Sequence, residues 1–228
     1  MAFINIAIDG PSGAGKSTIA RILAGELGYV YVDTGAMYRA IGYYVAQCGV
    51  EVKNEDLVSA VVPLADVELK YVKGIQHVYV NGDDVTSKIR TPRISEYASI
   101  VSSYGCVREH LLDLQRNIAK TNNIIMDGRD IGTTVLPDAQ IKIFLQADVR
   151  DRAQRRFDEL CLKGVKTTYS EVLNDMRERD YRDSHREISP LAKADDAVVL
   201  DTTGNTLEKS IGEVRDLIMG KLAEIEAK

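Results

Sequence analysis

Near its start the chain reads Ile4-Asn5-Ile6-Ala7-Ile8-Asp9-Gly10-Pro11-Ser12-Gly13-Ala14-Gly15-Lys16-Ser17-Thr18, an apolar run followed by a glycine-rich turn. Gly10, Gly15, Lys16 and Ser17 occupy every fixed position of the phosphate-binding pattern G-x-x-x-x-G-K-[ST]. Glycines let the backbone turn successive N–H groups toward an anion, and a helix beginning near Lys16 adds its own free N–H groups. A flexible turn between strand and helix is the alternative, but the flanking segments favour a P-loop.

This pattern assigns chemistry to individual residues. Lys16 is expected to reach the β- and γ-phosphates of a nucleotide, and the Ser17 hydroxyl to ligate Mg²⁺. The predicted phosphate-binding residues are Gly10, Pro11, Ser12, Gly13, Ala14, Gly15, Lys16, Ser17 and Thr18.

Composition narrows the class of protein. The chain has 228 residues, of which 45% are hydrophobic and 28% charged, as in one globular unit. The net charge of −5 argues against a nucleic-acid partner. Cys48, Cys106 and Cys161 are far apart and odd in number, so we expect free thiols. No apolar run approaches the ~20 residues of a membrane span, so a cytoplasmic protein with no membrane partner is expected.

Short apolar runs alternate with helical patterns, which predicts an α/β fold with a five-stranded parallel sheet flanked by helices. The expected strands are Phe3–Asp9, Tyr29–Val32, Asn123–Met126, Ile141–Gln146 and Ala197–Leu200. The expected helices cover about 16–27, 35–47, 92–120, 149–163, 169–187 and 206–224. Residues 67–85 instead alternate with period two around the turn signals Lys73-Gly74 and Asn81-Gly82, which predicts a small antiparallel insertion within about 62–92.

Two strand ends carry polar residues, and strand ends of this kind face the ligand crevice. The second strand runs into Asp33-Thr34-Gly35-Ala36-Met37-Tyr38-Arg39, where Thr34 is expected to cap the next helix and Arg39 to grip a second phosphate. Ile124-Ile125-Met126 runs into Asp127-Gly128-Arg129-Asp130, which combines a possible Mg²⁺-orienting carboxylate with a phosphate-binding guanidinium. A surface arginine and an ion-paired turn are the respective alternatives.

Two arginine stripes follow the fourth strand. Arg152, Arg155 and Arg156 share one helical face, and so do Arg179, Arg182, Asp183 and Arg186. Surface helices with local ion pairs would give the same pattern. In a phosphate-binding protein, however, a short arginine-rich lid with a hinge near Gly164 would clamp the phosphates and exclude water.

Taken in order, these segments resemble the bacterial cytidylate kinases of the nucleoside monophosphate kinase group, over essentially the whole chain. The matching segments are Ile8–Thr18, Asp33–Arg39, Ile89–Thr91, Val107–Glu109, Asp127–Asp130, Phe144-Leu145, Arg177–Asp180, Arg182-Asp183, Arg186 and Pro190-Leu191. Thr34 stands where many members carry Ser, and Ser17 where some carry Gly.

The resemblance implies a P-loop core at 1–33, 93–148 and 188–228, an acceptor-nucleotide region at 34–92 and a lid at about 149–187, within one unit. It implies ATP binding by the P-loop and Arg155, and Mg²⁺ at Ser17 and, through water, at Asp33. It places the acceptor phosphate at Thr34, Arg39, Arg129 and Arg186, the cytosine at Ser99, Arg108 and Asp130, and the sugar at Arg179 and Asp183. Lys16, Arg129, Arg155 and Arg186 would be catalytic.

The predicted reaction is therefore direct in-line phosphoryl transfer from ATP to CMP or dCMP, in a monomer. Another small-molecule P-loop kinase acting on UMP, AMP, shikimate or a coenzyme precursor is one alternative. A nucleotide-dependent switch or binding module is the other, although the guanine-reading pattern N-K-x-D is absent from the sequence.

Overall fold

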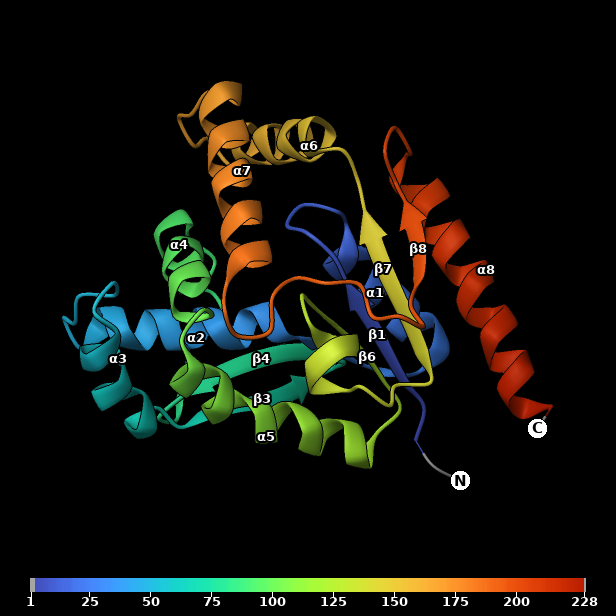
Figure 1. Ribbon diagram of the computed structural model, residues 1–228, viewed down its shortest axis with the longest axis horizontal. Coiled ribbons are helices and arrows are strands. Elements are labelled where there is room, and N and C mark those ends of the chain that lie inside the picture. Colours follow the sequence, from blue (N-terminus) through green and yellow to red (C-terminus); the bar gives the residue numbers. More distant parts are fainter. Residues whose placement is uncertain (1–2, 228) are drawn as a thin grey trace.

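The computed structural model describes residues 3–227. Its core is a parallel five-stranded sheet in the order β2-β6-β1-β7-β8 (Figure 1). The strands are β1 (Asn5–Asp9), β2 (Val30–Asp33), β6 (Ile124–Gly128), β7 (Ile141–Gln146) and β8 (Val198–Asp201). All five predicted strands are thus confirmed to within about two residues at each end, and the α/β class with them.

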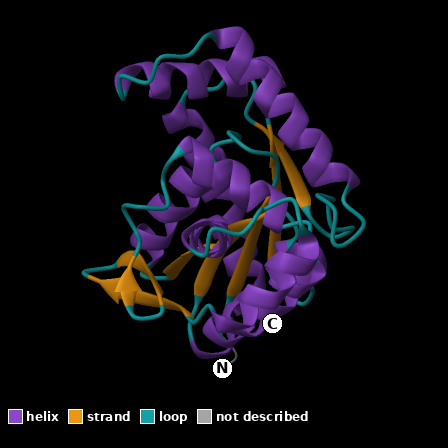
Figure 2. Cartoon of the chain, turned by 90° about the vertical axis from the view of Figure 1, so that its left-hand side faces the viewer, coloured by secondary structure: helices purple, strands orange, loops and turns teal. Residues whose placement is uncertain are grey.

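Helices cover both faces of this sheet, which explains why its central strands are almost continuously apolar (Figure 2). On one face, α1 (Lys16–Leu27) and α8 (Leu207–Glu226) pack Leu23 and Ile218 against Ile8 of β1. On the other face, α5 (Gly105–Thr121) packs Ala119 near Met126 of β6.

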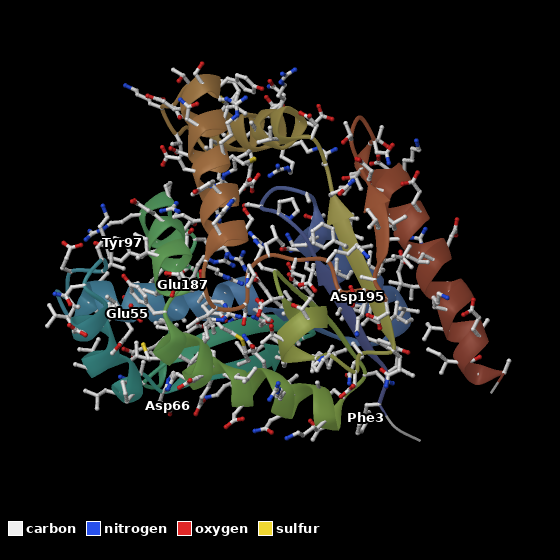
Figure 3. The ribbon with its side chains drawn as sticks, in the orientation of Figure 1. Phe3, Glu55, Asp66, Tyr97, Glu187 and Asp195 are labelled. Atoms are coloured by element: carbon white, nitrogen blue, oxygen red, sulfur yellow. The ribbon has the colours of Figure 1, made fainter. Side chains whose placement is uncertain are left out.

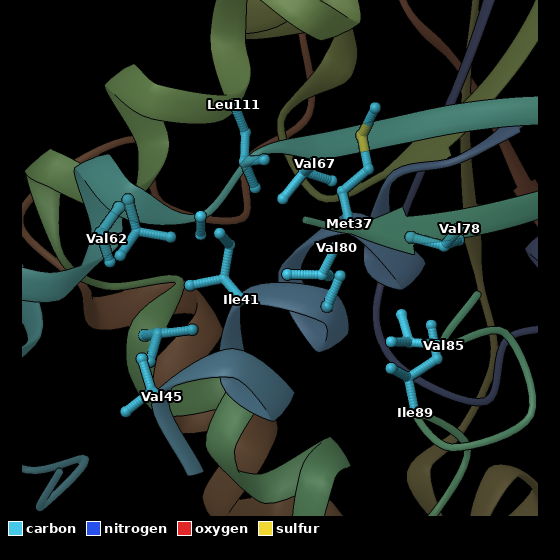
Figure 4. Close-up of a cluster of buried hydrophobic side chains, with 14 of the residues drawn as sticks. Met37, Ile41, Val45, Val62, Val67, Val78, Val80, Val85, Ile89 and Leu111 are labelled. Atoms are coloured by element: carbon cyan, nitrogen blue, oxygen red, sulfur yellow. The ribbon is translucent and has the colours of Figure 1, made fainter. Parts of the chain in front are cut away.

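The predicted insertion is confirmed as a three-stranded antiparallel sheet of β3 (Val67–Val72), β4 (Ile75–Val80) and β5 (Asp83–Asp84). It packs on α2 (Thr34–Gln47) through a buried cluster in which Met37 and Ile41 of α2 meet Val67, Val78 and Val80 (Figure 4). The insertion is therefore joined to the core by an apolar interface as well as by the chain.

Three expectations about helices were wrong. Helix α3 (Glu55–Val61) was not predicted, although Asn54 caps it by accepting the N–H of Leu57. The single helix expected at 92–120 is two, α4 (Pro92–Val101) and α5. The hydroxyls of Ser102 and Ser103 donate to carbonyls of the last turn of α4, and such bonds favour a break over continuation of the helix.

The third correction concerns the start of α2. Asp33, not Thr34, caps this helix, since its carboxylate accepts the N–H of Ala36 at 2.8 Å. Thr34 is the first helical residue, and its hydroxyl donates instead to the carbonyl of Asp127 on β6 at 2.7 Å. The start of α2 is therefore bonded to β6, the strand that ends near Asp127 and Asp130.

Helices α6 (Val149–Leu162) and α7 (Tyr169–His185) form a hairpin that extends over the carboxyl ends of the core strands (Figure 1). A small cluster of Ala153, Val172 and Met176 holds the pair together. Gly164 follows α6 with a positive φ of 71°, which ends the helix and allows the chain to turn back. None of the helices in residues 3–227 is both long and apolar enough for a membrane crossing.

Candidate active site

The candidate site is a cavity of about 1260 Å³ at the carboxyl ends of the core strands, where open α/β sheets bind ligands. In Figure 3 side-chain nitrogen atoms gather in this space, below α7. Predicted residues on its wall are Ser12, Gly13, Ala14, Gly15, Lys16, Ser17, Thr18, Asp33, Thr34, Arg39, Ser99, Arg129, Asp130, Arg155, Arg179, Asp183 and Arg186. Gly10, Pro11 and Arg108 lie outside that wall.

The P-loop has the backbone geometry that its glycines allow. Gly10, Gly13 and Gly15 all have positive φ values, of 145°, 77° and 91°. A Cβ on Gly10 would lie 1.9 Å from the carbonyl oxygen of Leu145 on β7, so only glycine fits there. Lys16 donates to the carbonyl of Pro11 at 2.7 Å, which folds its side chain back across the loop.

Lys16 is nearly inaccessible, with 4% of its surface exposed. Burial and the nearby positive charge of Arg129 hold the pKa of Lys16 well below its usual value. An anion bound in the cavity would raise the pKa of Lys16 again. Its negative charge would attract both Lys16 and Arg129, which now repel each other.

Ser17 points to Asp127 rather than to Asp33. The Ser17 hydroxyl donates to one carboxylate oxygen of Asp127 at 2.8 Å, and the Tyr31 hydroxyl donates to the other at 2.8 Å. Burial, reinforced by the charge of Asp33, raises the pKa of Asp127. A hydroxyl beside a buried carboxylate is a donor set suited to Mg²⁺, which prefers oxygen ligands and retains several waters.

Asp33 is engaged elsewhere. One of its carboxylate oxygens caps α2, and the other accepts from Arg39 at 2.9 Å and from Arg90 at 3.3 Å. No group of three or more His, Cys, Asp or Glu within residues 3–227 has the spacing to hold a metal ion. A cation here would therefore depend on phosphate oxygens and water in addition to Ser17 and Asp127.

Opposite the P-loop, arginines outnumber their carboxylate partners. Arg129 donates to Asp183 at 2.8 Å, and Arg39 to Asp33. The Nε atoms of Arg39 and Arg179 are buried with no hydrogen-bond partner among the described residues. Burial and the charge of Arg129 lower the pKa of Arg179 to about 10. This surplus of buried positive charge is an arrangement that an anionic group would stabilise.

Asp130 is the centre of a buried polar network. It forms ion pairs with Arg108 on α5 and with Arg186, the latter at 3.0 Å. Ser99 of α4 is 5% exposed and lines the cavity, and its hydroxyl has no hydrogen-bond partner within residues 3–227. The three residues expected at the base are therefore close to the same wall, with Arg108 behind Asp130.

Gln115 was not predicted. It is 1% exposed and lines the cavity, and its amide nitrogen has no hydrogen-bond partner among the described residues. Val107, Leu111 and Gln115 succeed one another every four residues along the buried face of α5. A polar amide in an apolar helical stripe is the signal that could have identified it.

The first arginine stripe divides into three environments. Arg152, predicted with the rest of the stripe to belong to a phosphate-clamping lid, is buried and donates to the P-loop carbonyl of Ser12 at 2.9 Å and to Asp180 at 2.7 Å. Arg155 donates to the carbonyl of Thr202 after β8 at 2.8 Å. Arg156 forms a partly exposed pair with Glu159 and also lines the cavity.

Asp9 connects the end of β1 to the turn that follows Asp130. Its carboxylate accepts the N–H groups of Ile131 and Gly132 at 2.8 and 2.7 Å, which shapes the short π-helical turn η2 (Ile131–Val135). Burial raises the pKa of Asp9 to about 6, despite these two hydrogen bonds. This residue was not predicted; a carboxylate inside an apolar strand was its signal.

A P-loop at the end of the first strand of a parallel sheet, facing buried arginines across one cavity, defines the class of P-loop kinases. The chain belongs to the cytidylate kinase family, whose model matches residues 6–221. It is 49% identical to the cytidylate kinase of Caldicellulosiruptor saccharolyticus, over 95% of this chain and 96% of that one. It is 48% identical to that of Lactobacillus johnsonii, over 96% and 95%.

Among solved structures, an uncharacterized protein from Eubacterium ventriosum has a TM-score of 0.51 and 14% identity, covering 94% of this chain and 98% of that chain. At this identity the likeness concerns the fold alone. The family assignment rests on the sequence relatives.

Proposed function

We propose that this enzyme transfers the γ-phosphoryl group of ATP to CMP and dCMP, with Mg²⁺, and forms ADP with CDP or dCDP. One observation carries the proposal: the P-loop lines the same cavity as a set of buried arginines that have too few carboxylates to neutralise them. Two phosphate-binding surfaces facing each other are what transfer between two nucleotides needs. The names of the curated relatives support the choice of acceptor.

In the proposed reaction an oxygen of the acceptor phosphate attacks the γ-phosphorus, and the bond from this phosphorus to the β,γ-bridging oxygen breaks. Lys16 neutralises charge on the donor phosphates after exchanging the Pro11 carbonyl for a phosphate oxygen. Thr34, Arg39, Arg129 and Arg186 hold the acceptor phosphate in line, and Arg155 acts from the ATP side. No residue is phosphorylated, because the acceptor is already a competent nucleophile.

Ser17 and Asp127 would hold Mg²⁺, which would supply positive charge to the donor phosphates. Asp127 is the better carboxylate for this role, because Asp33 is committed to α2, Arg39 and Arg90. Our proposal for the metal site accordingly replaces Asp33 with Asp127.

Base selection is assigned to Ser99, Arg108 and Asp130, and sugar contacts to Arg179 and Asp183. Cytosine carries an exocyclic amine beside its O2 and N3 acceptors, so a carboxylate with a hydroxyl and a guanidinium distinguishes it from uracil. The unpaired Ser99 hydroxyl and the Asp130 carboxylate on the same cavity wall support this assignment.

A substrate panel tests the proposal. The protein is incubated with ATP and Mg²⁺ and, separately, with CMP, dCMP, UMP, AMP, shikimate or no acceptor, and ADP formation is measured. We expect rapid turnover only with CMP and dCMP. Turnover confined to another acceptor would replace the substrate assignment, and no turnover with any of them would refute the kinase activity.

We also propose that residues 149–187 close as a lid over a core of 1–33, 93–148 and 188–228 and an acceptor region of 34–92. A single protomer suffices, since every residue invoked comes from one chain, and we place the reaction in the cytoplasm. Structures with and without a bisubstrate analogue test the closure, and identical lid positions would contradict it. Light scattering measures the oligomeric state.

A further inference from the structure

The inserted hairpin contacts the core sheet through the exposed edge of β2. In a parallel strand both backbone polar groups of one residue point to the same side, and the side alternates from residue to residue. Val30 donates its N–H toward β6, so Tyr31 and Asp33 direct their backbone groups away from the sheet. These outward groups would otherwise lack strand partners, because β2 is an edge strand.

Two side chains of the hairpin bond to three of these four groups. The Gln76 amide oxygen accepts the N–H of Asp33 at 2.9 Å, and its amide nitrogen donates to the carbonyl of Asp33 at 3.3 Å. The Tyr71 hydroxyl donates to the carbonyl of Tyr31 at 3.1 Å. Tyr71 and Gln76 are directly paired across β3 and β4, so a single face of the hairpin makes all three bonds.

The residue held in this way controls the acceptor side of the cavity. Asp33 is 4% exposed, and its carboxylate caps α2 and bonds both Arg39 and Arg90. Arg39 lines the cavity, whereas Gln76 and Tyr71 do not. A shift of the Asp33 main chain would therefore move Arg39, whose guanidinium the Asp33 carboxylate holds at 2.9 Å.

We propose that the inserted hairpin positions the acceptor-phosphate site, and that Gln76 is its positioning residue. Gln76 holds the main chain of Asp33, and the Asp33 carboxylate aims Arg39 into the cavity. The inference rests on the proposed function for the identity of the acceptor, but it requires only that the acceptor carry a phosphate.

The primary test compares Gln76→Met with Lys70→Met. Both place methionine on the same hairpin, but Lys70 is paired across the strands with His77 on the opposite face, and its side chain forms an ion pair with Glu68. We expect Gln76→Met to raise KM for CMP about 10-fold and leave KM for ATP within about 2-fold, since small misplacements of a binding group are costly. Lys70→Met should match the wild type.

An unchanged KM for CMP in Gln76→Met would overturn the proposal. So would equal increases in both KM values together with a collapse of the melting temperature, because these would indicate a purely structural role. If Gln76→Met does not fold, Tyr71→Phe decides, since it removes one hydroxyl from a partly exposed side chain. A selective increase of about 2-fold in KM for CMP is then expected, and wild-type kinetics would refute the proposal.

A double-variant cycle tests whether Gln76 acts through Asp33. The KM for CMP is measured for Asp33→Asn, Gln76→Met and the combination. Because coupled residues do not add independently, the double variant should be no worse than Asp33→Asn alone. Losses that multiply would show that Gln76 acts by another route.

The two proposals fail in distinguishable ways. A wild-type protein inactive with CMP but active with another phosphorylated acceptor would overturn the substrate assignment only. The same variants would then be measured with that acceptor. A wild type active with CMP and an unaffected Gln76→Met would overturn the positioning role only.

Discussion

The donor and acceptor sides of the cavity differ in how completely their polar groups are paired. On the donor side, Lys16 bonds to Pro11, and Ser17 bonds to Asp127. On the acceptor side, the Ser99 hydroxyl and the Nε atoms of Arg39 and Arg179 are buried without partners among the described residues. Unpaired buried groups cost free energy, and a ligand that pairs them recovers it.

This difference separates general phosphate binding from selectivity. A loop whose polar groups bond within the protein is expected to keep its shape in the absence of nucleotide, and the phosphates that it would contact are common to all nucleoside triphosphates. A wall of unpaired donors and acceptors rewards the one ligand whose groups match it and rejects ligands that leave them unpaired. We therefore expect donor-side changes to affect all acceptors equally and acceptor-side changes to alter the preference among them.

The largest effect is expected for Lys16→Ala. Loss of a buried cation that contacts the transferring charge should lower kcat/KM about 10³-fold for every acceptor. Steady-state kinetics with CMP and UMP checks both the loss and its uniformity. Lys209→Ala, at an exposed position on α8, is the matched control. A loss confined to CMP would contradict the division between the two sides.

Asp9 ends the strand before the P-loop, and its carboxylate bonds to the turn after Asp130, so it connects the donor side of the cavity to the acceptor side. The titration of Asp9 tests how much this connection contributes to stability. Its pKa is raised from 3.8 to about 6 in the folded protein, so the native state binds this proton more tightly than the unfolded state. Its contribution to stability is therefore full below about pH 4 and is lost as the pH rises through 6.

The measurement is the unfolding free energy of the wild type minus that of Asp9→Asn, determined by urea denaturation at several pH values. This difference should fall by up to about 3 kcal/mol between pH 4 and pH 7. A difference independent of pH would show that Asp9 does not titrate in this window.

Asp130→Ala should change the preference for CMP over UMP more than it changes kcat. Removing the carboxylate that we propose to face the base should reduce the CMP-over-UMP preference in kcat/KM by about 30-fold, because a hydrogen-bonding pocket discriminates chiefly through its buried polar groups. Competition between the two acceptors measures this ratio directly. An intact preference would remove Asp130 from base recognition.

The smallest predicted effect concerns Arg179 and is measured in both substrate binding and stability. Arg179 is buried beside Arg129, and its lowered pKa indicates an unfavourable environment for its charge. Arg179→Met should raise KM for CMP about 10-fold and leave the melting temperature of the free protein unchanged or a few degrees higher. A large fall in melting temperature would show that Arg179 stabilises the fold instead.

The same contrast determines what could be predicted from sequence. The P-loop is contiguous, and glycine spacing encodes its geometry, so Gly10 to Thr18 were located without any structure. The acceptor wall draws on α2, α4, β6 and α7 and on the hairpin behind them. No local pattern relates Ser99 to Asp130, and the family resemblance alone brought them together.

The missed residues share a cause. Asp9 and Gln76 act through hydrogen bonds to residues 43 or more positions away, and Gln115 lines the cavity from the buried face of α5. The sequence shows these polar residues but not the tertiary contacts that give them a role. Our preference for Asp127 over Asp33 at the proposed metal site likewise depends on tertiary structure. Which carboxylate faces Ser17 depends on the register of β2 against β6, where Asp33 and Asp127 are direct partners.

The contact between the hairpin and β2 also bears on self-association. An uncovered edge strand presents unpaired N–H and C=O groups that can recruit a strand from another molecule. Here Gln76 and Tyr71 occupy the carbonyl of Tyr31 and both backbone groups of Asp33. A chain shortened by removal of the hairpin would expose this edge, and we expect it to aggregate at concentrations where the intact protein remains dispersed.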